Sequence, residues 1–176
     1  MRKQLLLWEL AGFLMTAALG TALHFSYDWS GGWDVAAAFS AVNESTWEHM
    51  KLLFFPLFLL SMGQVFFLGR DYPNFLAART AGTVLGLALI PVLFYTYTGV
   101  LGTHLLWADI AVFLLAALGV FLLENRLLRE GRFRRLWQQA VGLAVLWALA
   151  FCFVWCTYRP VHLALWRDPV TGAFGI

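Results

Sequence analysis

The sequence predicts an all-α protein, a polytopic transmembrane helical bundle of about five spans plus a short interfacial or re-entrant helix, built as a single domain over residues 1–176. Hydrophobic residues make up 61% of the chain and charged residues only 12%, whereas soluble domains carry about 25% charged residues. So few charges cannot cover a water-exposed surface, and lipid must therefore face much of the protein. The net charge is only +2 and the basic residues lie in loops between apolar segments, so nothing supports nucleic-acid binding.

Five segments are long and apolar enough to cross a bilayer, which takes about 20 residues of helix. They cover residues 4–26, 50–69, 75–98, 105–125 and 135–158. Gly82 and Gly86 in the third segment form a GxxxG pair, which lets another helix approach closely, either within the protomer or across a homo-oligomer. The apolar stretch from Val35 to Phe39 is too short to span the bilayer, so it predicts the interfacial or re-entrant helix.

The basic residues predict the orientation of these spans. If the spans alternate in direction, nine of the twelve basic residues share the side of the N-terminus: Arg2, Lys3, Arg70, Arg79, Arg126, Arg129, Arg132, Arg134 and Arg135. Only Lys51, Arg159 and Arg167 fall on the other side. Cytoplasmic loops carry the excess of Lys and Arg. The sequence therefore predicts a cytoplasmic N-terminus and an external C-terminus.

With this orientation, titratable side chains from separate segments converge on the external face of the membrane. All four histidines lie there, together with most of the acidic residues: His24, His49, His104, His162, Asp28, Asp34, Glu44, Glu48, Asp109 and Asp168. This one-sided distribution suggests that the outer face carries the chemistry of the protein.

The densest polar stretch is Asn43–Lys51, directly before the second span. Ser45 and Glu48 have the spacing of a capping box at a helix N-terminus. Capping accounts neither for Lys51, a cation inside the helix, nor for His49, so we interpret the stretch as a functional polar site. Its candidate catalytic residues are Glu44, Glu48 and His49, while Asn43, Trp47 and Lys51 are candidates for holding a substrate or pairing a charge.

Asp109 is the second candidate of this kind, because an unpaired carboxylate near the start of the fourth span would be costly. Lys51, Arg159 or a metal ion could be its partner, and an ion pair that only fixes helix packing is the alternative. We expect one connected network that joins Glu44, Glu48, His49, Lys51 and Asp109.

The histidines also raise the question of a metal ion. Three histidines with one carboxylate form a plausible zinc set, and an open fourth position is typical of catalytic zinc. The candidate ligands are His24, His49, His104 and His162. Their spacing lacks any zinc signature, and a histidine at a helix end is more often an interfacial hydrogen-bonding residue. Zinc is therefore a candidate cofactor alongside this plainer interpretation.

Several stretches resemble a family of small uncharacterised bacterial membrane proteins. They are Trp8–Gly12, Gly20–Phe25, Ala41–Lys51 and Asp168–Gly172, and the most specific is the Asn-Glu-Ser-x-Trp-Glu-His block at residues 43–49. The resemblance spans nearly the whole chain. It implies a multi-pass protein of the bacterial cytoplasmic (inner) membrane, in contact with membrane lipids, and it carries over no activity.

Three functions remain open at this stage. The leading hypothesis is a polar pocket at the outer leaflet that binds or processes a small or lipid-like substrate. In an enzymatic version, Glu48 or His49 would act as the general base. The alternatives are an ion- or proton-coupled small transporter, and a non-catalytic structural or partner-binding subunit. The sequence does not decide whether the protein is an enzyme.

Overall fold

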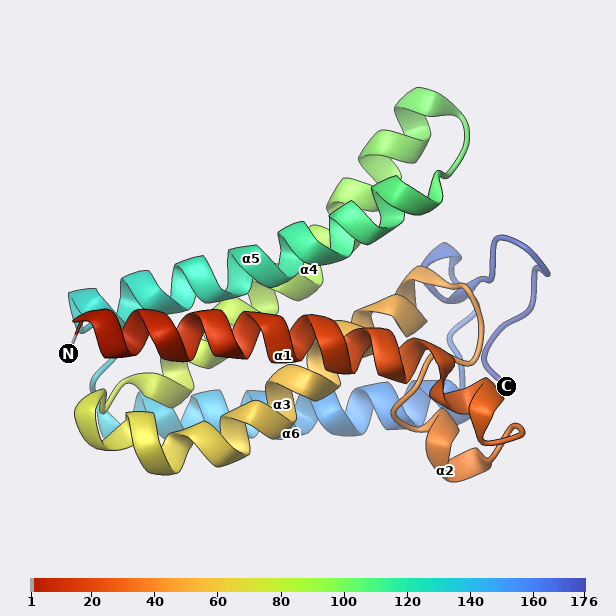
Figure 1. The fold of residues 1–176 in the computed structure, drawn as a ribbon. Coiled ribbons are helices and arrows are strands. Elements are labelled where there is room, and N and C mark those ends of the chain that lie inside the picture. Colours follow the sequence, from red (N-terminus) through yellow and green to blue (C-terminus); the bar gives the residue numbers. More distant parts are fainter. Residues whose placement is uncertain (1) are drawn as a thin grey trace.

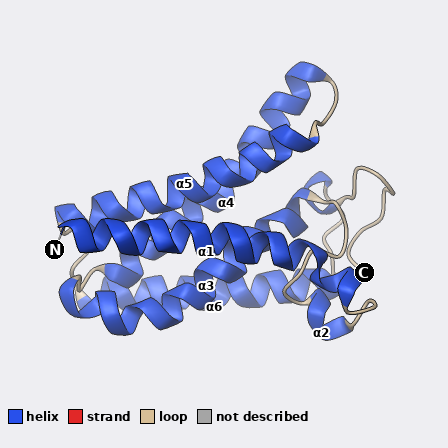
Figure 2. Ribbon diagram, viewed as in Figure 1, coloured by secondary structure: helices blue, strands red, loops and turns tan. Residues whose placement is uncertain are grey.

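The computed structural model describes residues 2–176, and helices joined by short loops make up most of this range (Figure 2). The five long helices are α1 (Arg2–Trp29), α3 (Thr46–Asp71), α4 (Phe75–Leu101), α5 (Leu106–Glu130) and α6 (Leu136–Tyr158). Each is apolar and long enough to cross a membrane. The predicted all-α bundle of five spans is therefore confirmed, and α2 (Asp34–Ala37) lies where the sequence predicts the short helix.

The helices extend past the predicted spans at most of their ends. Hydropathy locates the part of a helix that matches the hydrocarbon layer, whereas the helix itself continues with polar residues into the interface. Thus α5 continues to Glu130 and stops where Gly131 takes the left-handed conformation, with φ of 65°. The start of α3 is set by Ser45, whose hydroxyl accepts a hydrogen bond from the backbone N–H of Glu48.

The turns between α3 and α4 and between α5 and α6 lie at the end of the bundle where α1 begins, while α2 and the C-terminal tail lie at the opposite end (Figure 1). Among the spans, α3 is the most buried, and it packs against α1, α4 and α6. Leu53, Phe54 and Leu57 of α3 are fully buried in the main apolar core. The tail contains the short 3-10 helix η1 (Ala164–Trp166).

The GxxxG pair packs α4 against α5 within the protomer. A methyl group added to Gly82 would lie 2.8 Å from the carbonyl oxygen of Val120 on α5, and one added to Gly86 would meet the Val120 side chain. Only residues without a side chain allow the two helices this approach. The motif is thus used inside the bundle, and the homo-oligomer stays a prediction that does not rest on it.

At the end that the sequence predicts to lie outside the cell, here called the outer end, the α4–α5 hairpin leans away from the other helices (Figure 1). Pro91 lies inside α4, and proline removes a backbone hydrogen bond and favours a bend in a helix. The divergence separates the start of α5, which carries Asp109, from the outer ends of α1 and α3.

The orientation can be tested with single cysteines introduced in a background where Cys152 and Cys156 are serine. Because most basic residues lie on the other side, Ser30→Cys and Ala173→Cys should react with an impermeant maleimide in intact cells. Arg134→Cys should react only after permeabilisation. Labelling of position 134 in intact cells would reverse the orientation and place the histidines on the cytoplasmic side.

Candidate functional site

Lys51 is a fully buried cation whose hydrogen-bonding capacity is completely used. Its Nζ lies 2.7 Å from Glu48 Oε2 and donates to the carbonyl oxygen of Ala37 and to Thr157 Oγ1, each at 2.8 Å. The Lys51 side chain is 0% exposed. An ammonium group has three N–H donors, so none is left for a substrate. Lys51 therefore ties α2, α3 and α6 together at the outer end of the bundle.

Glu48 extends this connection to the loop before α3. Its Oε2 also accepts a hydrogen bond from the backbone N–H of Val42, at 3.1 Å. The predicted capping box is thus half formed: Ser45 caps Glu48, but the N–H of Ser45 donates to Asn43 Oδ1 instead of to Glu48. Asn43 in turn donates to the carbonyl oxygen of Gly175 in the tail. These bonds fix the loop, and with it the position of Glu44.

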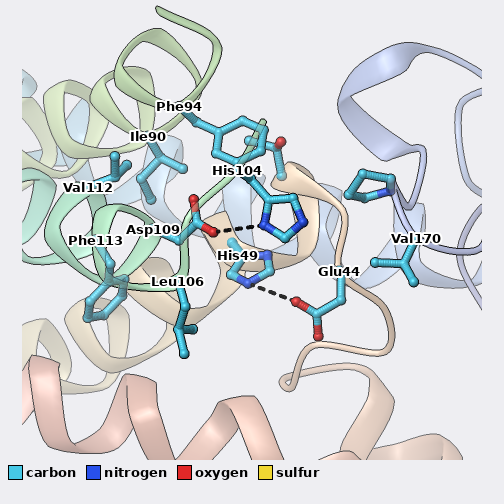
Figure 3. Close-up of a pocket in the computed structure, with 12 residues that line it drawn as sticks. Glu44, His49, Ile90, Phe94, His104, Leu106, Asp109, Val112, Phe113 and Val170 are labelled. Atoms are coloured by element: carbon cyan, nitrogen blue, oxygen red, sulfur yellow. Dashed lines mark hydrogen bonds and ion pairs between the residues drawn. The ribbon is translucent and has the colours of Figure 1, made fainter. Parts of the chain in front are cut away.

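Glu44, His49 and His24 gather on the other side of the α3 N-terminus. Glu44 Oε2 lies 3.5 Å from His49 Nε2 (Figure 3), while His49 Nδ1 lies 2.9 Å from the carbonyl oxygen of Ser45. The ring of His24, from α1, stands edge-on to the ring of His49 with 5.3 Å between centroids. One ligand atom from each of the three residues lies within 4.8 Å of the others. They form a group that could hold a metal ion.

Asp109 pairs with residues other than the partners expected from the sequence, Lys51 and Arg159. It accepts a hydrogen bond from the Tyr97 hydroxyl, and its Oδ2 lies 3.4 Å from His104 Nδ1 (Figure 3). Neither Lys51 nor Arg159 pairs with it among the described residues. Tyr97, near the end of the third predicted span, therefore donates to Asp109 in the outer polar cluster.

Two cavities bring these groups together. A cavity of about 150 Å³ is lined by Glu44, His49, His104 and Asp109 together with apolar side chains such as Phe94 (Figure 3). A second cavity of about 280 Å³ shares five lining residues with the first and continues between α1 and α5. The shared residues are Glu44, His49, Leu106, Asp109 and Phe113. The two cavities thus adjoin, with polar groups at their junction and mostly apolar walls beyond.

The expected single network therefore divides in two. Lys51 and Glu48 line neither cavity and form the buried ion pair that ties α2, α3 and α6 together. Glu44, His49 and Asp109 line both cavities. Positions 48 and 49 differ by about 100° around the helix axis, which places their side chains on different sides of α3.

The other sequence candidates lie outside the cavities. Trp47 is buried and stacks on Trp166 with 4.5 Å between ring centroids, so it packs the tail onto the bundle. Arg159 is exposed and joins no ion pair among the side chains that the structure describes. The ring of His162 packs against Phe174 in the tail. His104 and His162 do not belong to the group that could hold a metal ion.

Sequence reasoning missed a second buried cluster, at the inner end. Arg79 Nε lies 2.6 Å from Glu124 Oε2, and its terminal nitrogen donates to Gln64 Oε1 at 2.8 Å. Arg79 was assigned to the inner charge excess, but only 1% of its side chain is exposed. Both residues lie inside predicted spans near the same membrane face, and opposite charges at matching depths were the available signal. Glu9 is also buried, and neither of its carboxylate oxygens has a partner among the described residues.

A model of a family of unknown function, DUF6512, matches residues 2–176. The chain therefore belongs to this family, which confirms that it is a member of an uncharacterised group. No curated protein and no solved structure matches the chain.

The tail that borders the smaller cavity depends on Asp168. Burial by itself would raise the pKa of Asp168, but hydrogen bonds from the Thr171 hydroxyl and the Val170 N–H outweigh it and hold the pKa below its ordinary value. The ionised form therefore favours the folded tail. Pro169 and Val170, which follow directly, line the cavity.

A nitroxide label at Ala173 should report this dependence. Because the pKa is lowered in the folded tail, its stabilising contribution is complete above the unfolded value of about 3.9 and is lost as pH falls through the folded value. The label should stay immobile at neutral pH and become mobile only in stronger acid, by electron paramagnetic resonance. In Asp168→Asn it should be mobile at both pH values. A tail that loosens near neutral pH, or an Asp168→Asn tail that stays ordered, would contradict this role.

Proposed function

We propose that this DUF6512 protein binds an amphipathic, lipid-like molecule from the outer leaflet of the bacterial cytoplasmic membrane. The polar group of the ligand lies at the junction of the two cavities, among Glu44, His49 and Asp109. Its apolar part lies between α1 and α5. The orientation follows from the excess of basic residues at the inner ends of the spans.

One observation carries this proposal: the larger cavity joins convergent polar groups to an apolar surface that faces lipid. Phe25, Leu106, Ile110 and Leu114 line the cavity, and each is at least 38% exposed. A ligand could therefore enter sideways from the bilayer without crossing water. The volume of this cavity, about 280 Å³, is close to the lower limit of about 300 Å³ for small-molecule pockets. This is enough for a head group and the start of a chain.

The charges at the cavity restrict the class of head group. The described residues that line the two cavities include the imidazoles of His24, His49 and His104 and the carboxylates of Glu44 and Asp109. They include no lysine or arginine. Carboxylates accept hydrogen bonds and repel anions. The proposal therefore favours a head group that carries a hydroxyl or an amine over one that ends in a free phosphate.

If the protein also processes its ligand, His49 and Asp109 are better placed than Glu48 to move a proton. Glu48 is bonded to Lys51 and Val42 and lines neither cavity. His49 and Asp109 line both cavities, so a ligand in either cavity meets them. The sequence favours Glu48 or His49 as the general base. The proposal keeps His49 and replaces Glu48 with Asp109.

A proton- or ion-coupled transporter is a second candidate, favoured by the unpartnered polar groups of the inner half. The carboxylate of Glu9 and the hydroxyl of Thr16 are buried on α1 without a partner among the described residues. Glu9 lies close enough to Arg79 and Glu124 for their charges to act on it. Glu9, Thr16, Gly20 and His24 follow one face of α1 at helical spacing, and the last two line the larger cavity. Polar groups thus follow α1 from the inner cluster to the outer cavities.

A photoactivatable long-chain amino alcohol, added to the protein in liposomes, tests the binding proposal. Crosslinks should map to α5 around Ile110 and Leu114, and an untagged competitor should suppress them. Glu44→Gln and Asp109→Asn should each weaken labelling about tenfold, because a hydrogen bond to a charged group contributes roughly 1.5–3 kcal/mol. Asp28→Asn is the matched control, since Asp28 is an exposed carboxylate of the same face that lines neither cavity.

Labelling spread evenly over the lipid-facing helices, or unchanged in Glu44→Gln and Asp109→Asn, would contradict a specific pocket. A proton flux across liposomes without any added ligand, abolished by Glu9→Gln, would favour the transport function instead.

A further inference from the structure

His24, Glu44 and His49 come from three separate segments and present metal-ligating atoms to one point. His24 belongs to α1, Glu44 to the loop after α2, and His49 to α3. One ligand atom from each lies within 4.8 Å of the others. We propose that these three residues bind a divalent transition-metal ion of the class that includes zinc.

The separation of Glu44 and His49 fits a shared ion better than a direct bond. Glu44 Oε2 and His49 Nε2 are 3.5 Å apart, whereas a charge-assisted hydrogen bond between such atoms spans about 2.7–2.9 Å. Two ligands that bind one tetrahedral zinc at about 2.0–2.1 Å lie about 3.4 Å from each other. The two side chains are thus already spaced as neighbouring ligands.

The hydrogen bond at the far side of the His49 ring supports the same conclusion. The carbonyl oxygen of Ser45 can only accept, so His49 Nδ1, at 2.9 Å, must donate. In a neutral ring, Nε2 then carries the lone pair, and this lone pair faces a carboxylate oxygen. A ring nitrogen that donates to a backbone carbonyl is also the usual support of a metal-binding histidine.

The set of ligand atoms selects the class of ion. Two imidazole nitrogens and one carboxylate oxygen suit zinc, whereas calcium and magnesium prefer oxygen ligands alone. The two cysteines, which would favour copper(I), lie on α6 and are not part of the group. Three protein ligands leave one position of a tetrahedral ion open.

The open position gives the proposed function a point of attachment for its ligand. Glu44 and His49 line both cavities, so an ion held between them would meet a hydroxyl or carbonyl oxygen of the head group. This step rests on the proposed function. Metal binding itself does not, and it can be measured without any lipid.

The test is zinc binding by the purified full-length protein, prepared without chelators in its isolation and then titrated with Zn²⁺ after removal of bound metal. We expect one equivalent of zinc per chain. His24→Gln, Glu44→Gln and His49→Gln should each weaken binding by more than about a hundredfold, since loss of even an outer-sphere partner costs about 10- to 100-fold. His162→Gln should leave binding unchanged, because His162 packs in the tail away from the group. Substituted Co²⁺ should give the strong visible absorption of a tetrahedral site.

Less than one equivalent of zinc in the folded wild-type protein would overturn the inference, and so would a loss in His162→Gln as large as in His49→Gln. Thermal melting of each metal-free variant checks that the chain still folds. Zinc binding without labelling by the amino-alcohol probe would leave the metal site standing and contradict the proposed function. Labelling by the amino-alcohol probe without zinc binding would support the proposed function and contradict the metal site.

Discussion

The buried ammonium group of Lys51 is the constraint on which the outer end of this protein depends. Removing a charge from water costs several kcal/mol, and a buried ion is tolerated only when its hydrogen bonds are satisfied. Lys51 meets this condition with a carbonyl of α2, a hydroxyl of α6 and the carboxylate of Glu48. The same carboxylate holds the backbone of Val42. One satisfied cation therefore fixes the loop that carries Glu44.

This arrangement separates support from chemistry within a few residues of one helix. Glu48 and Lys51 point into the protein and have little capacity left for a ligand. His49 points toward α1 and α5, where Glu44, His24 and Asp109 surround the cavities. The rotation of about 100° between successive helical residues produces this separation. A dense polar stretch in the sequence is thus two separate groups in space: one buried, and one lining the cavities.

The architecture was predictable from the sequence and the pairing of its charges was not. Spans follow from the length of the apolar segments. The ends of the five predicted segments agree with the ends of the observed helices to within a few residues. Partners depend on how each helix rotates against its neighbours, which hydropathy does not contain. Lys51 meets Thr157 across 106 positions of the chain, and Asp109 meets Tyr97 instead of Lys51. Arg79 is one of the nine basic residues that predict the orientation, and hydropathy gives no sign that it is buried against Glu124.

We propose that Glu44 and His49 serve binding while Lys51 serves stability. The thermal stability of single variants in detergent tests this division most directly. Lys51→Met leaves the Glu48 carboxylate buried without its partner, so it should lower the free energy of unfolding by about 3–5 kcal/mol. In metal-free protein, Glu44→Gln and His49→Gln should stay within about 0.5 kcal/mol of the wild type, as is usual for partly exposed positions. If they destabilise the protein as much as Lys51→Met does, the outer cluster is only a packing device and the account is wrong.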